Sequence, residues 1–546
     1  MGAVMPLALV LVSSSALLAS ALVLVAGALR GSLVLPSVPL WPLASFLALA
    51  LLQLVPLPSA LHRLLAPGSY AAWHPADAAV AGVLGAQARP LSLDPGTTLA
   101  AVALVSGLTL LAALAAPALA RPRTAQLAVA VVAASGFLLS AYAIWARARF
   151  GSLLYGSIPV PTIAPFGPFV SKNHFAGWTE MAALLTAGLA LGLADESRRR
   201  GRDWTTDARA GGVILALVTS LAMALAVFAS LSRGGMLALA AGASCLLALR
   251  LSGARGRGAL VATLAPALVL GGILIGLVPQ DAHERMRSLS GASFRLDTWK
   301  DTLRLAASSP LVGYGLGAFH DAYPRFKRGH GIVRVEHAEN DYLETLAETG
   351  VLGLGLALAG IALLVVGPGA AQGPAPGAVV RGIRQGALAA LAALSVHSLV
   401  DFNLRIPSNA ALAALAAAAA AAAAGARSRR LSRPLAAALG AVAVALALAT
   451  ARPPEQPGLL ARAELQAAAS AGLPAQRRLR LERASARLEQ ALRRRPADAE
   501  SWLLLAFTHQ ALGRPDAAVA LARHALVLDP GRPGLREAAD RIAGAP

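Results

Sequence analysis

Long, uninterrupted apolar runs are the feature that most constrains the fold of this chain. Each run has roughly 17 to 25 residues, enough for a helix to cross about 30 Å of hydrocarbon at 1.5 Å per residue. Hydrophobic residues make up 56% of the 546 residues and charged residues only 14%, so most of the chain requires lipid or protein around it. The sequence therefore predicts an all-α fold, a polytopic transmembrane helical bundle.

About twelve spans are expected from these runs. Between two of them lies a large polar loop, residues 280–348, which concentrates acids, bases and histidines. The predicted spans cover residues 7–29, 36–56, 98–117, 125–145, 174–194, 211–230, 234–250, 258–278, 350–366, 385–400, 409–425 and 434–450.

Arginines gather in three of the loops, which the positive-inside rule marks as cytoplasmic. Counting spans from these loops places the large loop, the C-terminal tail and the N-terminus on the outer side. Much of the net charge of +20 therefore lies in short loops, where it determines the topology. The sequence shows no basic groove with interleaved aromatic residues, the pattern that would indicate nucleic-acid binding. The loop arginines are Arg198, Arg199, Arg200 and Arg202, then Arg250, Arg255 and Arg257, then Arg427, Arg429, Arg430 and Arg433.

The composition predicts a membrane domain at 1–451, a stiff proline-rich linker at 452–457 and a helical repeat domain at 458–546. Pro496 and Pro530 are 34 residues apart, the period of tetratricopeptide repeats. About two such repeats and a capping helix near 534–543 are expected, with small residues packed against Trp502. Because two repeats bury little core, we expect this domain to lean on the membrane domain or to bind a protein partner. The alternative is a helical hairpin that only stabilises the chain.

Four polar residues near the end of the large loop have helical spacing. His337, Asn340, Asp341 and Glu344 stand at i, i+3, i+4 and i+7, which predicts one face of a helix that leads into the span near Gly350. They are candidates to line one cavity. The alternative is a solvated polar helix end.

Arg233 lies in a hairpin of only a few residues between two spans, within Ser232-Arg233-Gly234-Gly235. An arginine held close to the outer membrane surface suggests an anionic ligand. The alternative is that its side chain simply reaches the lipid headgroups.

Two further polar clusters stand at outer ends of spans. Lys172, Asn173 and His174 open one span, where the free N–H groups of a helix start also favour anions; a helix cap is the alternative. His397 and Asp401 form an i, i+4 pair near the end of another span, and either a binding site or a structural hydrogen bond explains such a pair. We include all five as candidate substrate-binding residues.

Within the large loop, Arg295 is the better candidate to bind an anion. The turn Gly313-Tyr314-Gly315-Leu316-Gly317 would let backbone approach a phosphate, but without a preceding strand this signal is weak. The sequence contains no metal-binding motif and no cysteine cluster, so no metal and no cofactor are expected.

Taken together, these segments resemble the O-antigen ligase and polymerase family of bacterial envelope glycosyltransferases. The resemblance covers roughly residues 40–410 and does not extend to the C-terminal repeats. It runs through Leu91 to Gly96, Lys172 to Gly177, Ser232 to Gly235, Arg295 to Trp299, Pro310 to Gly317, and His337 to Leu343.

The resemblance implies a metal-independent, inverting transfer of glycan from undecaprenyl diphosphate to lipid A core, a growing polysaccharide or a protein. It also implies that Arg233 and Arg295 clamp the diphosphate and that His337 serves the acceptor hydroxyl. Glu336, Glu339, Asp341 and Glu344 are candidates to orient the histidine or to hold sugar hydroxyls. The implied location is the bacterial inner membrane, with the large loop and the C-terminal domain periplasmic.

We therefore expect an enzyme of the O-antigen ligase type that works among membrane lipids. A polymerase or a protein O-oligosaccharyltransferase is the alternative within the same chemistry. A transporter of lipid-linked sugar would show polar residues near the middle of several spans, and a non-catalytic envelope scaffold would depend on the C-terminal repeats and not on Arg233 or His337.

Overall fold

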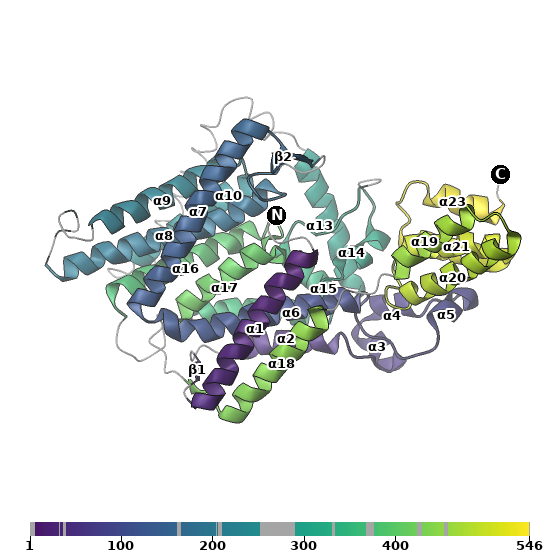
Figure 1. Ribbon diagram of the computed structural model, residues 1–546, viewed down its shortest axis with the longest axis horizontal. Helices are drawn as coiled ribbons and strands as arrows, with labels where there is room; N and C mark the ends of the chain where they lie inside the picture. The colour runs from purple at the N-terminus through teal and green to yellow at the C-terminus, as the bar shows by residue number, and fades with distance from the viewer. Residues whose placement is uncertain are drawn as a thin grey trace. The chain divides into compact units, whose positions relative to one another are not determined.

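The computed structural model describes residues 6–31, 33–35, 40–160, 165–201, 203, 205, 210–251, 290–329, 333–366, 376–422, 429–451 and 457–544. Within these residues the chain is almost entirely helical (Figure 1), so the all-α prediction is confirmed. The described strands form two short antiparallel pairs, β1 (Val34–Leu35) with β4 (Arg429–Arg430) and β2 (Leu153–Leu154) with β3 (Ile158–Pro159).

Nine helices in the described ranges are long and apolar enough to cross a membrane. These helices agree with a polytopic membrane protein, but they do not include all of the predicted spans. The segment predicted at 36–56 forms only the short helix α2 (Trp41–Leu52), and the one at 409–425 forms α17 (Pro407–Ala422). The span predicted at 258–278 lies outside the described residues. The nine helices cover Ala8–Arg30, Pro95–Leu119, Pro122–Phe150, Lys172–Arg199, Ala210–Ala229, Arg233–Leu251, Asp341–Leu364, Ala378–His397 and Arg433–Ala451.

The chain divides into two compact units. Unit 1 is Met1–Pro42, Ala103–Ser288 and Leu358–Ala451, and unit 2 is Leu43–Val102, Leu289–Ala357 and Arg452–Pro546. Helices α6 (Pro95–Leu119) and α15 (Asp341–Val366) each continue from one unit into the other. The predicted boundaries at 451 and 458 stay predictions; residues 452–456 of the expected linker lie outside the described ranges.

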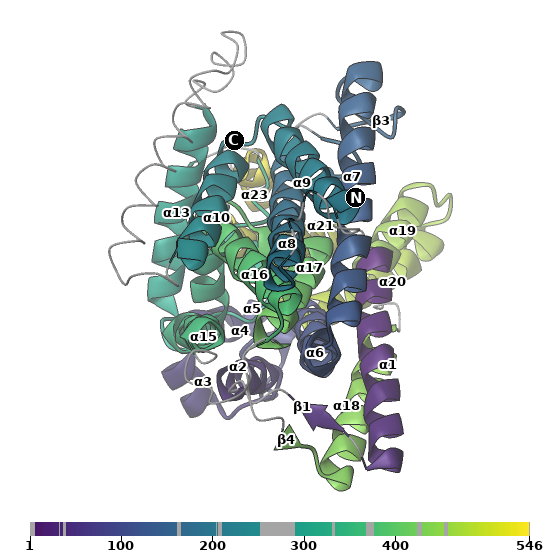
Figure 2. The same cartoon turned by 90° about the vertical axis from the view of Figure 1, so that its left-hand side faces the viewer.

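Unit 1 is built around α8 (Lys172–Arg199), which lies among its neighbours in Figure 2 and is the most buried of the candidate spans. Its helical neighbours are α7 (Pro122–Phe150), α9 (Ala210–Ala229), α10 (Arg233–Leu251), α16 (Ala378–His397) and α17 (Pro407–Ala422).

Helices α8 and α16 approach closely because glycines face each other across their contact. A Cβ atom on Gly188 would lie 2.5 Å from the carbonyl oxygen of Gly382, and one on Gly386 would lie 2.6 Å from that of Leu184. Each helix therefore carries small residues four apart, Gly188 with Gly192 and Gly382 with Gly386, the pattern that permits close packing in membranes.

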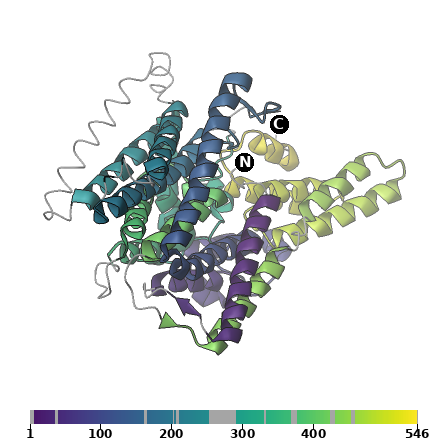
Figure 3. The same ribbon diagram turned by 60° about the vertical axis from the view of Figure 1, so that its left-hand side comes forward.

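A second helix pair of unit 1 joins the two ends of the membrane sequence. Helices α1 (Pro6–Arg30) and α18 (Arg433–Ala451) run side by side in Figure 3, and the β1–β4 pair connects the end of α1 with the start of α18. The pair is therefore antiparallel. Leu17, Ala21, Ala443 and Ala447 form its buried contact.

Unit 2 contains the short helices that follow α2 and the helices of the large loop. Those at 67–73, 290–308 and 319–326 pack around Trp73, Leu305, Phe319 and Tyr323, all almost fully buried. The helices are α3 (Ser59–Leu65), α4 (Pro67–Trp73), α5 (Ala78–Leu84), α13 (Ser290–Ser308) and α14 (Phe319–Ala322), followed by the 3-10 turn η1 (Tyr323–Phe326).

The C-terminal part of unit 2 is a series of helices in which each packs against the next. Trp502 and the alanines predicted to pack with it are buried in one core, and Val80, Val83 and Leu84 of α5 join that core. The assignment to the tetratricopeptide class stays a prediction. The helices are α19 (Pro457–Ala469), α20 (Pro474–Leu492), α21 (Ala499–Ala511), α22 (Pro515–Leu528) and α23 (Leu535–Ala543).

Candidate active site

In unit 1, Arg233 is fixed by the turn that precedes it. Ser232 directly precedes α10, and its hydroxyl accepts from the N–H of Gly235 at 3.2 Å and donates to Asn173 Oδ1 at 2.9 Å. Lys172 Nζ donates to the carbonyl of Leu231 at 2.9 Å, a residue with a φ of 55°. The start of α8 thus holds the hairpin, and Arg233 stands exposed on the first turn of α10.

Beside this hairpin, four ionisable side chains are buried together. His397 Nδ1 lies 3.1 Å from Glu180 Oε1, and His397 Nε2 lies 3.8 Å from Asp401 Oδ2. The other carboxylate oxygen of Asp401 lies 3.5 Å from His174 Nε2. All four side chains are at least nine-tenths buried, so they serve as partners to one another. The predicted proximity of His397 and Asp401 is confirmed; substrate contact by these residues stays a prediction.

Glu180 is the member of this cluster that the sequence analysis missed. It lies in the first third of α8 with no exposed surface. A lone acid inside an apolar span is itself a signal, because an unpaired charge there is costly. Its partner His397 stands 217 residues later. The sequence could therefore indicate that Glu180 needs a partner, but not that His397 is that partner.

In unit 2, His337 is paired with Glu344. The Nδ1 atom of His337 lies 2.9 Å from Glu344 Oε1, and the N–H of Ala338 donates to Glu344 Oε2 at 2.8 Å. Glu344 is 1% exposed, whereas the side chain of His337 is 33% exposed. Glu344, one of the acids that were candidates to orient the histidine, therefore contacts its ring. Glu336 instead lies at the surface near Arg334.

The predicted helix face is wrong for His337. Helix α15 begins at Asp341, and Asn340 caps it by accepting from the N–H groups of Tyr342 and Leu343, each at 3.0 Å. His337 precedes the helix. The chain turns back between them through Glu339, whose φ is 54°, and this turn rather than helical spacing brings His337 to Glu344.

Arg295 lies on α13 and contacts Glu339. Its Nε and Nη2 atoms are each 3.5 Å from Glu339 Oε2, longer than the about 2.7–2.9 Å of a strong charge-assisted hydrogen bond. The arginine is about a quarter exposed. Arg295 of α13 therefore lies beside the segment that carries His337 and Glu339, directly before the start of α15.

The glycine-rich turn does not resemble a phosphate-binding loop. Its N–H groups donate within the protein: Tyr314 to Ala347, Gly315 to Glu348, and Leu316 to the side chain of Gln53. A Cβ on Gly313 would lie 2.3 Å from the carbonyl carbon of Glu348. The glycines therefore allow the turn to pack against α15, which is the structural reason for this motif.

One group of described residues has the spacing of metal ligands: Asp94, His320 and Asp321. Arg495 already contacts all three, with Nη2 at 2.5 Å from Asp321 Oδ1 and 3.3 Å from His320 Nε2, and Nε at 3.4 Å from Asp94 Oδ2. Burial raises the pKa of Asp321, although His320 and Arg495 oppose this. The guanidinium therefore supplies the positive charge in this group.

The region that carries Arg233, Arg295 and His337 is similar to a known family. Residues 218–358 match a family model described as O-antigen ligase. The match covers about a quarter of the chain and includes Asn340, Asp341 and Glu344. No curated protein matches the chain.

The match supports the ligase or polymerase family and therefore a membrane enzyme that transfers glycan. Substrates in this family are in general a lipid-linked polysaccharide and an acceptor. The other candidate residues lie outside the matched region: Lys172, Asn173, His174, His397 and Asp401, together with the C-terminal helices.

Proposed function

We propose that this protein transfers a glycan from an undecaprenyl-diphosphate-linked donor to an envelope acceptor, as an O-antigen ligase does, with inversion and without a metal. The observation that carries the proposal is the pair of His337 and Glu344 inside the region that matches the O-antigen ligase model. A histidine backed by a carboxylate suits the removal of a proton from a hydroxyl group.

In this mechanism His337 is the general base. A neutral imidazole that donates Nδ1–H to Glu344 carries its lone pair on Nε2. That nitrogen takes the acceptor proton as the acceptor oxygen bonds to the anomeric carbon. The bond from this carbon to the diphosphate breaks, and undecaprenyl diphosphate leaves with the electron pair. Attack opposite the leaving group inverts the anomeric carbon in one step.

Positively charged side chains next to the diphosphate supply the remaining stabilisation, because negative charge grows on the leaving group in the transition state. We assign this role to Arg233 and Arg295. The exposed position of Arg233 on the first turn of α10 and the long contact of Arg295 with Glu339 both suit binding of a phosphate.

We place the protein in the bacterial inner membrane, with the large loop and the C-terminal helices on the periplasmic side. In support, the ion pair between Asp321 of the large loop and Arg495 of the C-terminal helices requires both segments on one side of the membrane. The C-terminal helices, as tetratricopeptide-like repeats, would bind a protein partner.

The test is transfer by the purified full-length protein from a native undecaprenyl-diphosphate-linked glycan pool to lipid A core, polysaccharide and protein acceptors, in detergent with EDTA. The proposal expects transfer that survives EDTA and yields an inverted linkage, and loss by a factor of about 10² or more in folded Arg233→Ala and His337→Ala. The accepting molecule separates ligase, polymerase and protein-glycosylating activities. Undiminished transfer in the variants contradicts the site, and an absence of transfer favours a transporter or scaffold.

A further inference from the structure

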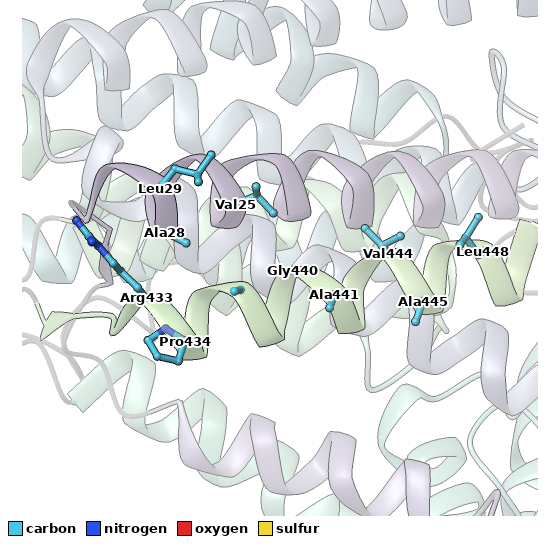
Figure 4. Close-up of a pocket in the computed structure, with 11 residues that line it drawn as sticks. Val25, Ala28, Leu29, Arg433, Pro434, Gly440, Ala441, Val444, Ala445 and Leu448 are labelled. Carbon is cyan, nitrogen blue, oxygen red and sulfur yellow. The ribbon is translucent and has the colours of Figure 1, made fainter.

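An apolar groove runs along the α1–α18 pair of unit 1 (Figure 4), and none of the candidate site residues lines it. Its volume is about 740 Å³. Val25 and Leu29 of α1 line it with Val444 and Leu448 of α18, and Gly440 and Ala441 of α18 also border it. Leu29 is 78% exposed and Leu448 is 63% exposed, so in a bilayer this surface lies against lipid tails.

The groove has a length that suits one acyl chain. Its lining on α18 extends from Arg433 to Leu448, which is about 22 Å at 1.5 Å per residue. This exceeds half of the about 30 Å of bilayer hydrocarbon, so a chain anchored at one surface would remain in the groove to the middle of the membrane. The small side chains at Gly440 and Ala441 leave the room for it.

Arg433 marks one end of the groove. In Figure 4 its side chain extends from the start of α18 toward the end of α1, and its guanidinium lies against Gly31, where a Cβ atom would be 2.7 Å from Nη2. Among the described residues no carboxylate forms an ion pair with Arg433, and Arg30 and Arg430 stand at the same end of the helix pair. This end is therefore positively charged next to an apolar groove.

We propose that the α1–α18 groove binds an anionic phospholipid, with its phosphate at Arg433 and one acyl chain between Val25, Leu29, Val444 and Leu448. Neither feature alone specifies this ligand: the apolar wall accepts any lipid tail, and the guanidinium accepts any phosphate. Together they select a molecule in which a negatively charged headgroup and an acyl chain are joined. Span counting puts Arg433 and Arg233 on opposite membrane faces, so this site is distinct from the proposed donor site.

The test is native mass spectrometry of the delipidated full-length protein titrated with phosphatidylglycerol or with phosphatidylcholine of the same acyl chains. We expect phosphatidylglycerol to bind about fivefold more tightly, equivalent to the about 1 kcal/mol that a basic residue contributes near an anionic headgroup. Arg433→Gln should remove this preference while leaving phosphatidylcholine binding unchanged. Ala441→Phe, which fills the groove, should weaken binding of both lipids.

Two matched variants control for charge and bulk, and neither residue lines the groove. Arg30→Gln removes a charge at the same end and should lower the preference for phosphatidylglycerol less than Arg433→Gln does. Ala449→Phe adds the same ring to the exposed surface of α18 and should bind both lipids as the wild type does. Equal binding of the two lipids by the wild type, or equal effects of Arg433→Gln and Arg30→Gln, would overturn the proposal. So would a dimer that Ala441→Phe dissociates, because a second copy would then occupy the groove.

Discussion

Arg495 donates to Asp321 at 2.5 Å across 174 residues of sequence. The arginine stands in the turn between α20 and α21, and the carboxylate belongs to α14 of the large loop. The side chain of Asp321 is only 5% exposed. This ion pair, with the packing of α5 against the C-terminal helices, ties together the three segments of unit 2.

Arg495→Met should therefore loosen the C-terminal helices, because it leaves the buried carboxylate of Asp321 without its cation. Breaking a fully buried pair costs about 3–5 kcal/mol; Arg495 is 39% exposed, so we expect about 2 kcal/mol and faster proteolysis within residues 457–544. Arg532→Met is the control, since its pair with Glu500 is exposed and worth about 0–1 kcal/mol. Equal proteolysis of the two variants would refute this role.

Gly350→Ala should destabilise the protein, while Gly355→Ala in the same helix should not. Gly350 has a φ of 65°, and a Cβ there would lie 2.2 Å from the carbonyl oxygen of Leu311. With its ψ of −171°, Gly350 has a backbone conformation that essentially only glycine adopts; it costs an alanine about 1–3 kcal/mol, and the overlap adds to this. Gly355 has open space around it, so alanine should be neutral or favourable there. Unfolding temperatures of the two variants in detergent provide the comparison, and a Gly350→Ala variant as stable as the wild type contradicts it.

The stability of unit 2 should fall as the pH is lowered from about 6.5, in part because of His62. Burial, and secondarily His74, lowers the pKa of His62 to about 4, whereas an unfolded histidine titrates near 6.5. Between these values the unfolded chain binds a proton that the folded chain does not, so stability decreases with decreasing pH. His62→Gln should reduce the fall in unfolding temperature between pH 7.5 and 5.5; an unchanged fall would remove His62 from the explanation.

Glu180→Ala should destabilise unit 1 by about 3 kcal/mol or more, because it removes the carboxylate that lies 3.1 Å from His397 in a fully buried place. Glu180→Gln, which retains an acceptor oxygen, should cost less. Glu196→Gln is the matched control on the same helix, since Glu196 pairs with Arg200 at the surface. Thermal unfolding in detergent ranks the three variants. Equal unfolding temperatures for Glu180→Ala and Glu196→Gln would mean that the buried pair contributes nothing.

Apolar run length predicted most of the membrane helices, because a span depends on local composition. Within the described residues the exception is 36–56, whose helix α2 is only 12 residues long. Prolines lie near both ends of this run, and hydropathy alone does not register the breaks that proline causes.

The sequence predicted which residues belong to the candidate site better than it predicted how these residues are arranged. Helical spacing suggested a link between His337 and Glu344, but the contact depends on a left-handed residue at Glu339, which no periodicity indicates. The glycine turn at 313–317 was ambiguous because its partner Gln53 stands 263 residues before Leu316. Long-range partners of this kind, like Glu180 with His397, follow from the fold and not from local pattern.

The pairing of His337 with Glu344 gives the most direct test of the account. If Glu344 acts only by orienting His337, then Glu344→Gln should slow transfer by about 10- to 100-fold in the wild-type background and have no further effect once His337 is alanine.

The measurement is the single-turnover rate of glycan transfer for the wild type, His337→Ala, Glu344→Gln and the double variant, each folded to the same extent. The account predicts that the double variant is as slow as His337→Ala and no slower. Losses that multiply, or full activity in Glu344→Gln, would contradict the assignment of His337 and Glu344 as one catalytic unit.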